Sequence, residues 1–123
     1  MSAHYGKDIP QKHINGAVIG GVVIEGQADL RVMASGAGLQ LCELYLKQGY
    51  YHPLHHHPEH ESIGYVISGK IEMQIGEETV VLGAGDSWHH PIGVPHSTRA
   101  LEDSYAVESH NPLRPEYLPN TTA

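Results

Sequence analysis

Histidine is concentrated in two short segments of this chain, where it could bind a metal ion or move protons. The segments are His55-His56-His57-Pro58-Glu59-His60-Glu61 and Trp88-His89-His90-Pro91-Ile92-Gly93-Val94-Pro95-His96. Neutral imidazole is the commonest protein ligand for divalent transition metals, and its ordinary pKa suits proton transfer near neutral pH. The two segments therefore indicate a metal site with acid–base groups beside it.

Both histidine segments lie within a regular frame of glycines. The frame positions are Gly49, His55, His57 and Gly69 in the first segment, and Gly85, Pro91, Gly93 and His96 in the second. This frame resembles the two motifs of the cupin family, G-x5-H-x-H-x(3,4)-E-x6-G and G-x5-P-x-G-x2-H-x3-N. The resemblance covers residues 17–118. It implies a single all-β domain, a jelly-roll barrel of the RmlC-like type.

The resemblance implies one divalent transition metal bound by His55, His57 and His96. His55 and His57 are two residues apart, so on a strand both point to the same side while His56 points to solvent. His96 follows a Pro-Gly turn and begins another strand. Zinc is the favoured metal, with iron, manganese and nickel as alternatives.

The family's fourth ligand is a Glu or Gln seven residues before the closing Gly69, and here that position is Ser62. A serine hydroxyl is a poor ligand for a transition metal. His60 lies two residues earlier, on the same face if the strand extends that far, and is our preferred fourth ligand. The alternatives are a three-histidine site with open positions, and Glu61 brought in through a bulge.

Three histidines are candidates for proton transfer: His60, His89 and His90. His89 and His90 are adjacent on one expected strand, so only one of them can face the interior. The small residues Ser62 and Gly64 would leave room in the barrel for a sizeable organic ligand.

The rest of the chain favours an all-β fold without a long amphipathic helix. Residues 1–15 are expected to form an N-terminal arm, and residues 16–123 the barrel with a C-terminal tail. β-branched runs recur between turn residues, which is typical of a barrel or sandwich. The expected strands are Ala17–Ile24, Leu30–Ala34, Leu39–Leu46, Tyr50–His57, Ser62–Ser68, Ile71–Ile75, Thr79–Leu82, Ser87–His90, His96–Ala100 and Tyr105–Glu108.

The charge and composition of the chain limit the classes of molecule that it is expected to bind. The net charge is −7 and only seven residues are Lys or Arg, which disfavours nucleic acid. No apolar run is long enough to span a membrane. The single Cys42 and a polar N-terminus without a signal-peptide pattern predict a cytoplasmic protein. The exposed edges of a small antiparallel barrel, together with residues 1–15, predict a homodimer.

The end of the chain resembles one particular group of cupins. Asn111-Pro112-Leu113-Arg114-Pro115-Glu116-Tyr117-Leu118 is similar to the P-x-R-x-x-[YF]-L tail of short single-domain cupins. That group includes cupins that act on unsaturated uronates released from pectin and alginate. In this interpretation Arg114 pins the tail through an ion pair or faces a substrate.

The function that these observations favour is that of a metal-dependent enzyme acting on a small oxygen-rich organic substrate. The metal would act as a Lewis acid while a histidine moves the proton, as isomerase, cyclase, ring-opening or lyase chemistry requires. One alternative is an Fe(II) dioxygenase of the three- or four-histidine cupin type. Another is a non-catalytic, metal-dependent cupin that binds a small molecule or sugar.

Overall fold

Short segments separated by glycine turns form twelve strands within residues 3–112, the part of the chain that this computed structural model describes. The N-terminal elements are a 3-10 turn at Gly6–Asp8 (η1), then β1 (Lys12–His13), β2 (Val18–Ile19), β3 (Val22–Val23), β4 (Ala28–Ser35), β5 (Gln40–Leu46) and β6 (Tyr51–His55). The chain continues with β7 (Glu61–Ser68), β8 (Lys70–Ile75), β9 (Glu78–Gly83), β10 (Ser87–His90), β11 (His96–Ala100) and β12 (Ser104–Asn111).

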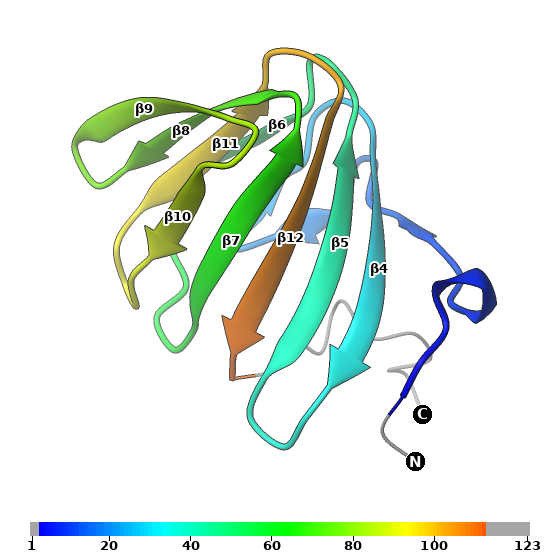
Figure 1. Ribbon diagram of the computed structural model, residues 1–123. Helices are drawn as coiled ribbons and strands as arrows, with labels where there is room; N and C mark the ends of the chain where they lie inside the picture. The colour runs from blue at the N-terminus through cyan, green and yellow to red at the C-terminus, as the bar shows by residue number, and fades with distance from the viewer. Residues whose placement is uncertain (1–2, 113–123) are drawn as a thin grey trace.

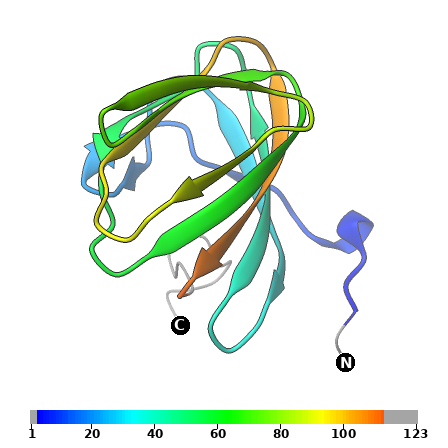
Figure 2. The same cartoon turned by 60° about the vertical axis from the view of Figure 1, so that its left-hand side comes forward.

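Ten of the strands form two antiparallel sheets that curve around one interior, and β2 and β3 pair as a separate two-stranded sheet (Figures 1 and 2). The larger sheet has the order β1-β4-β5-β12-β7-β10, and the smaller has the order β6-β11-β8-β9. Apolar side chains from both sheets fill the interior, among them Leu30, Cys42, Val66, Ile71 and Met73. The predicted all-β jelly-roll barrel is confirmed.

Two strands, Ser87–His90 and His96–Ala100, begin and end where the sequence predicts. One prediction is wrong: Ala17–Ile24 is not a single buried strand. Gly20 and Gly21 both have positive φ, +66° and +80°, and turn the run into the β2–β3 hairpin. A two-residue turn with positive φ at both positions is the commonest hairpin connection. Apolar residues flank the two glycines, so the sequence pattern does not predict a turn there. In the structure only Ile19 and Ile24 of this run are buried, while Val18 and Val23 are exposed.

The N-terminal arm is joined to the barrel of its own chain. Lys12 and His13 pair with Leu30 and Asp29 of β4, at the edge of the larger sheet. Ile14 is only 3% exposed and belongs to the core. The arm therefore covers the β4 edge at Asp29 and Leu30.

Two further observations concern the ends of the chain and its helices. The tail motif continues beyond Pro112, so Arg114 lies outside the described residues. Within residues 3–112 no helix is long and apolar enough to cross a membrane.

Candidate metal and acid–base site

Three imidazoles converge at one end of the barrel interior. His55 lies at the end of β6 and pairs with His96 at the start of β11, while His57 follows β6 by two residues. Their ligand atoms all lie within 4.8 Å of one another. Nitrogens bound to one zinc ion at about 2.1 Å lie at most about 4.2 Å apart, so small ring rotations would bring the three onto one ion.

The tautomers of two of these rings follow from their hydrogen bonds. His55 Nδ1 lies 2.7 Å from the carbonyl oxygen of Pro53, and His96 Nδ1 lies 3.2 Å from that of Val94. A carbonyl oxygen only accepts, so each Nδ1 carries the hydrogen and each Nε2 keeps its lone pair. Metal-bound histidines are commonly held through their other nitrogen in this way. The three rings therefore fit a divalent transition metal.

A β-bulge brings one more histidine, His52, beside the three imidazoles, and these four rings form the histidine wall. Between β11 and β6, His96 pairs with His55 and Thr98 pairs with His52, so β6 has one extra residue in this interval. His52 and His55 are three residues apart, yet both are buried. Their rings stack with centroids 3.6 Å apart. Bulges re-aim side chains in this way, and no residue pattern in β6 predicts the bulge.

The predicted proton-transfer candidates separate into interior and surface residues. His90 is 5% exposed and lines the cavity. His89 points outward, and its Nε2 pairs with the Glu61 carboxylate at 3.0 Å. Of this adjacent pair, His90 is therefore the residue that faces the interior and His89 the one that faces outward. Glu61 lies at the mouth of the cavity but is not part of the three-histidine group.

His60 also lines the cavity mouth, where it is half-buried. Its ring centroid lies 6.0 Å from that of His57, and the ring is not a member of the three-histidine group. His60 as the fourth ligand therefore stays a prediction. The outward orientation predicted for His56 is confirmed, because this residue is exposed.

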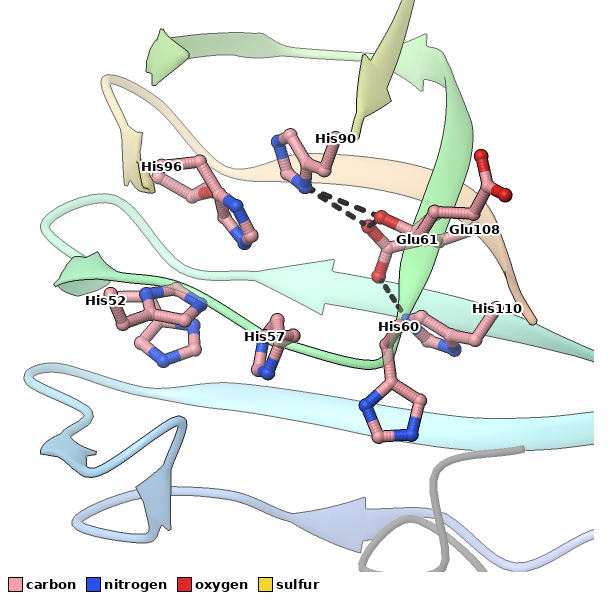
Figure 3. A pocket seen from close by; sticks show the side chains of 11 residues that line it. His52, His57, His60, Glu61, His90, His96, Glu108 and His110 are labelled. Carbon is pink, nitrogen blue, oxygen red and sulfur yellow. Dashed lines mark hydrogen bonds and ion pairs between the residues drawn. The ribbon is translucent and has the colours of Figure 1, made fainter. Parts of the chain in front are cut away.

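A carboxylate faces the same cavity from the opposite wall (Figure 3). Glu108 lies on β12, and its Oε2 accepts hydrogen bonds from Trp88 Nε1 and from Ser62 Oγ, both at 3.2 Å. Its Oε1 lies 2.8 Å from His110 Nε2. Sheet register explains the cluster, because Glu108, Gly64 and Trp88 are neighbours across three strands.

Ser62 and Gly64 do not leave room for a sizeable ligand, contrary to the prediction. A Cβ built on Gly64 would lie 2.0 Å from Cζ2 of Trp88, so the indole ring occupies the space above this glycine. Ser62 is covered by its bonds to Glu108 and His90. The remaining cavity has a volume of about 40 Å³, enough for a few waters or one end of a small molecule.

His90 is an uncharged hydrogen-bonding group between the two walls. Burial lowers the pKa of its imidazole to about 3; the nearby Glu108 carboxylate raises the pKa, and the neighbouring His96 lowers it. The Ser62 hydroxyl donates to Glu108, so its oxygen can accept from His90 Nδ1, 3.3 Å away. That arrangement leaves the lone pair on His90 Nε2, a buried atom without a hydrogen-bond partner among the described residues.

The carboxylate wall, formed by Glu108 with Ser62, Trp88 and His110, is not predicted from the sequence. Its members Glu108 and His110 alternate with outward-facing residues of β12 and follow the buried Ala106. Polar residues that continue the buried register of a strand are a usable signal. The predicted strand ended at Glu108, whereas β12 continues to Asn111, and this hid the alternation.

Comparisons with known proteins agree with this fold. A family model described as "Cupin domain" matches residues 43–108, more than half of the chain. The chain is 38% identical over 60 residues to the dimethylsulfoniopropionate lyase DddQ of Ruegeria pomeroyi, covering 48% of this chain and 29% of the lyase. It is 33% identical over 82 residues to the oxalate decarboxylase OxdC of Bacillus subtilis, covering 63% of this chain and 21% of the decarboxylase. The chain thus spans less than a third of the length of these curated relatives.

Solved structures show the same fold along nearly the whole chain. KdgF from Halomonas sp. superposes with a TM-score of 0.81 and 24% identity, covering 95% of this chain and all of that one. An RmlC-like cupin from Shewanella frigidimarina superposes with a TM-score of 0.80 and 20% identity, covering 94% of this chain and 95% of that one. At such identities the likeness extends to the fold alone.

Proposed function

The chain belongs to the cupin family, and we propose that it is a metal-dependent enzyme that moves a proton on a small, oxygen-rich organic molecule. One observation carries the proposal: three imidazoles suited to a metal and a hydrogen-bonded carboxylate face the same narrow cavity. A Lewis acid beside an acid–base group is the arrangement that lyase, isomerase and cyclase chemistry requires.

The three-histidine set defines one end of the proposed reaction site. A divalent metal held by His55, His57 and His96, for which we propose zinc, would supply a Lewis acid that polarises a substrate oxygen. The described residues lining the cavity include no Lys or Arg. A carboxylate or hydroxyl of the substrate therefore finds no positively charged side chain there, which favours binding of this group at the histidine end.

Glu108 defines the other end and is the proposed proton-transfer group. Trp88 and Ser62 both donate to its Oε2 and so fix the carboxylate in orientation. Such a carboxylate can take a proton from a substrate carbon or hydroxyl and return it to a neighbouring atom. His90 Nε2 can accept a hydrogen bond from a substrate hydroxyl, and His60 at the mouth is a second candidate for proton transfer.

The relatives suggest which reactions should be tested first. Two curated relatives are a lyase and a decarboxylase whose names denote small carboxylate substrates. The tail motif adds unsaturated uronates as a second substrate class. We therefore propose elimination or isomerisation next to a carboxylate. An Fe(II) dioxygenase is the second candidate, because a three-histidine set leaves coordination positions open for dioxygen and substrate.

The test combines metal analysis with turnover. Untagged protein is stripped of metal and reloaded with zinc, iron, manganese or nickel. It is then assayed with dimethylsulfoniopropionate, oxalate and unsaturated uronates. Turnover that needs the metal supports the proposal; dioxygen uptake limited to the iron form favours the dioxygenase. Metal-dependent ligand binding without turnover would indicate the non-catalytic alternative.

Glu108→Gln tests the acid–base role directly, because it keeps the size of the side chain. We expect kcat to fall about 10²- to 10⁴-fold, the usual contribution of general acid–base catalysis, with metal affinity nearly unchanged. Glu102→Gln is the control, since Glu102 is exposed and lies outside the cavity. Unaltered kcat in Glu108→Gln would exclude the carboxylate from the reaction.

We also propose that the protein is a homodimer. Large apolar side chains stand on the outer face of the larger sheet, with Leu41, Ile63 and Tyr65 exposed by 43%, 59% and 47%. They border a groove of about 690 Å³. Exposed apolar patches of this kind mark interaction sites. Light scattering should give twice the chain mass of 13.4 kDa, and the monomer mass at micromolar concentration would contradict the dimer.

A further inference from the structure

The turn of the β2–β3 hairpin lies directly against the proposed metal ligands. Gly20 is at the tip of this turn with φ +66°. A Cβ built on Gly20 would lie 2.5 Å from Cδ2 of His55 and 3.1 Å from Cε1 of His57. Real Cβ atoms essentially never approach as closely as 2.5 Å, so any side chain at this position would displace the His55 ring.

A second contact joins the same hairpin to the histidine wall. The carbonyl oxygen of Ile19 accepts a hydrogen bond from His52 Nε2 at 2.8 Å. The His52 ring in turn stacks on the ring of His55, with an interplanar angle of 17°. The hairpin therefore touches His55 by two routes, through the backbone at Gly20 and through the stacked ring of His52.

The neighbouring glycine lacks this contact. Gly21 also has positive φ, +80°, but a Cβ built on it would meet nothing within 4 Å. Alanine at either position would have to adopt the left-handed conformation that L-residues disfavour. Only alanine at position 20 would also press on the histidine rings. The two glycines are therefore a matched pair that separates backbone strain from contact with the site.

We propose that the Gly20 turn and His52 are positioning elements of the metal site, which hold the rings of His55 and His57 in the orientation that binds the ion. The inference rests on the proposed metal binding. Groups that orient metal ligands typically contribute ten- to a hundredfold to metal affinity. The absence of a side chain at position 20 is then a requirement of the site, in addition to a requirement of the turn.

Gly20→Ala and Gly21→Ala are compared by titrating the metal-free proteins with zinc against a chromogenic chelator. The unfolding temperature of the metal-free proteins, measured alongside, should fall in both variants through backbone strain, and further in Gly20→Ala because only this alanine presses on the histidine rings. We expect Gly21→Ala to bind zinc within about threefold of the unsubstituted chain, and Gly20→Ala to bind about ten- to a hundredfold more weakly. Equal zinc affinity in the two variants would overturn the proposal.

His52→Leu provides a second test that leaves the turn unchanged. It removes the hydrogen bond to Ile19 and the stacked imidazole while keeping an apolar side chain of similar size. We expect about tenfold weaker zinc binding, and unchanged affinity would count against the role of His52. If the unsubstituted chain binds no zinc or other divalent metal, the proposed function fails together with this inference. If that chain binds metal and all three variants match it, only the inference fails.

Discussion

The two walls of the cavity are built in different ways. The histidine wall comes from two short stretches, the end of β6 and the start of β11, where the Nδ1 atoms of His55 and His96 each hydrogen-bond to a carbonyl oxygen two residues earlier. The carboxylate wall comes from β12, β7 and β10, three strands whose register places Glu108, Ser62 and Trp88 together. Local hydrogen bonds thus set the ring orientations in the first wall, whereas the assembled sheet sets the contacts of the second.

This difference predicts how the two walls respond to substitution. The hydrogen bonds of His55 and His96 are local, so removing a ring there should affect metal binding more than folding. The Glu108 side chain is only 12% exposed and accepts hydrogen bonds from donors on other strands. Removing one partner of such a largely buried polar group destabilises the fold. Substitutions in the carboxylate wall should therefore change both stability and chemistry.

The largest effect is expected from removing a metal ligand. His55→Ala and His96→Ala should each lower zinc affinity more than about a hundredfold, because loss of a direct ligand exceeds loss of a group that merely orients one. His56→Ala is the matched control, since His56 lies between two ligands and is exposed. Elemental analysis after dialysis checks the result. Retention of metal in His96→Ala would mean that His96, at the start of β11, is not a metal ligand.

The next largest effect is a dependence of protein stability on pH, which comes from His90 between the two walls. The pKa of His90 is about 3 in the folded protein, against 6.5 for an ordinary histidine. Between these values the unfolded chain binds a proton that the folded chain does not. The free energy of unfolding should therefore fall as the pH is lowered from 6.5 toward 3, by at most a few kcal/mol from this group.

His90→Gln tests this contribution, because glutamine does not titrate. Urea unfolding of the metal-free proteins across pH 4–8 should show a shallower loss of stability in the variant than in the unsubstituted chain. The comparison between variants removes the contribution of the other histidines. Identical pH dependence in both proteins would mean that folding does not lower the pKa of His90.

The contrast between the walls also explains what the sequence could predict. Strand alternation places His55 and His57 on one side, and the resemblance to the cupin motifs joins His96 to them. No local pattern states that β12 lies between β5 and β7, and Glu108 could be placed only through that order. Cupin resemblance supplied the barrel, but not the partners of each side chain within it.

Two further failures have specific physical causes. Apolar residues on both sides of Gly20-Gly21 gave the pattern of one buried strand, although positive φ at both glycines makes a hairpin. Gly64 was read as empty space, whereas a side chain from the adjacent strand, Trp88, fills it. In both cases a glycine's effect depended on what packs against it, which composition does not reveal.

A smaller effect, on stability alone, is expected from substituting Gly64. It tests whether the carboxylate wall can be disturbed without changing metal binding at the histidine wall. Alanine there would press its Cβ into the Trp88 ring and move the indole away from Glu108. Overpacking of this kind costs about 1–3 kcal/mol. Gly38→Ala is the control, because its nearest contact would be at 3.9 Å. Chemical denaturation should show the loss in Gly64→Ala alone, with zinc affinity unchanged. Loss of zinc binding would mean that the two walls are coupled.

The smallest effect is expected at His60, which decides where the histidine wall ends. Its ring lies at the cavity mouth, 6.0 Å from the ring of His57 and outside the three-histidine group. We therefore expect His60→Ala to weaken zinc binding by less than about tenfold, below the usual contribution of a direct ligand. A loss of more than a hundredfold would instead make His60 the fourth ligand. Lower kcat with unchanged zinc affinity would indicate that His60 takes part in proton transfer, as proposed for Glu108.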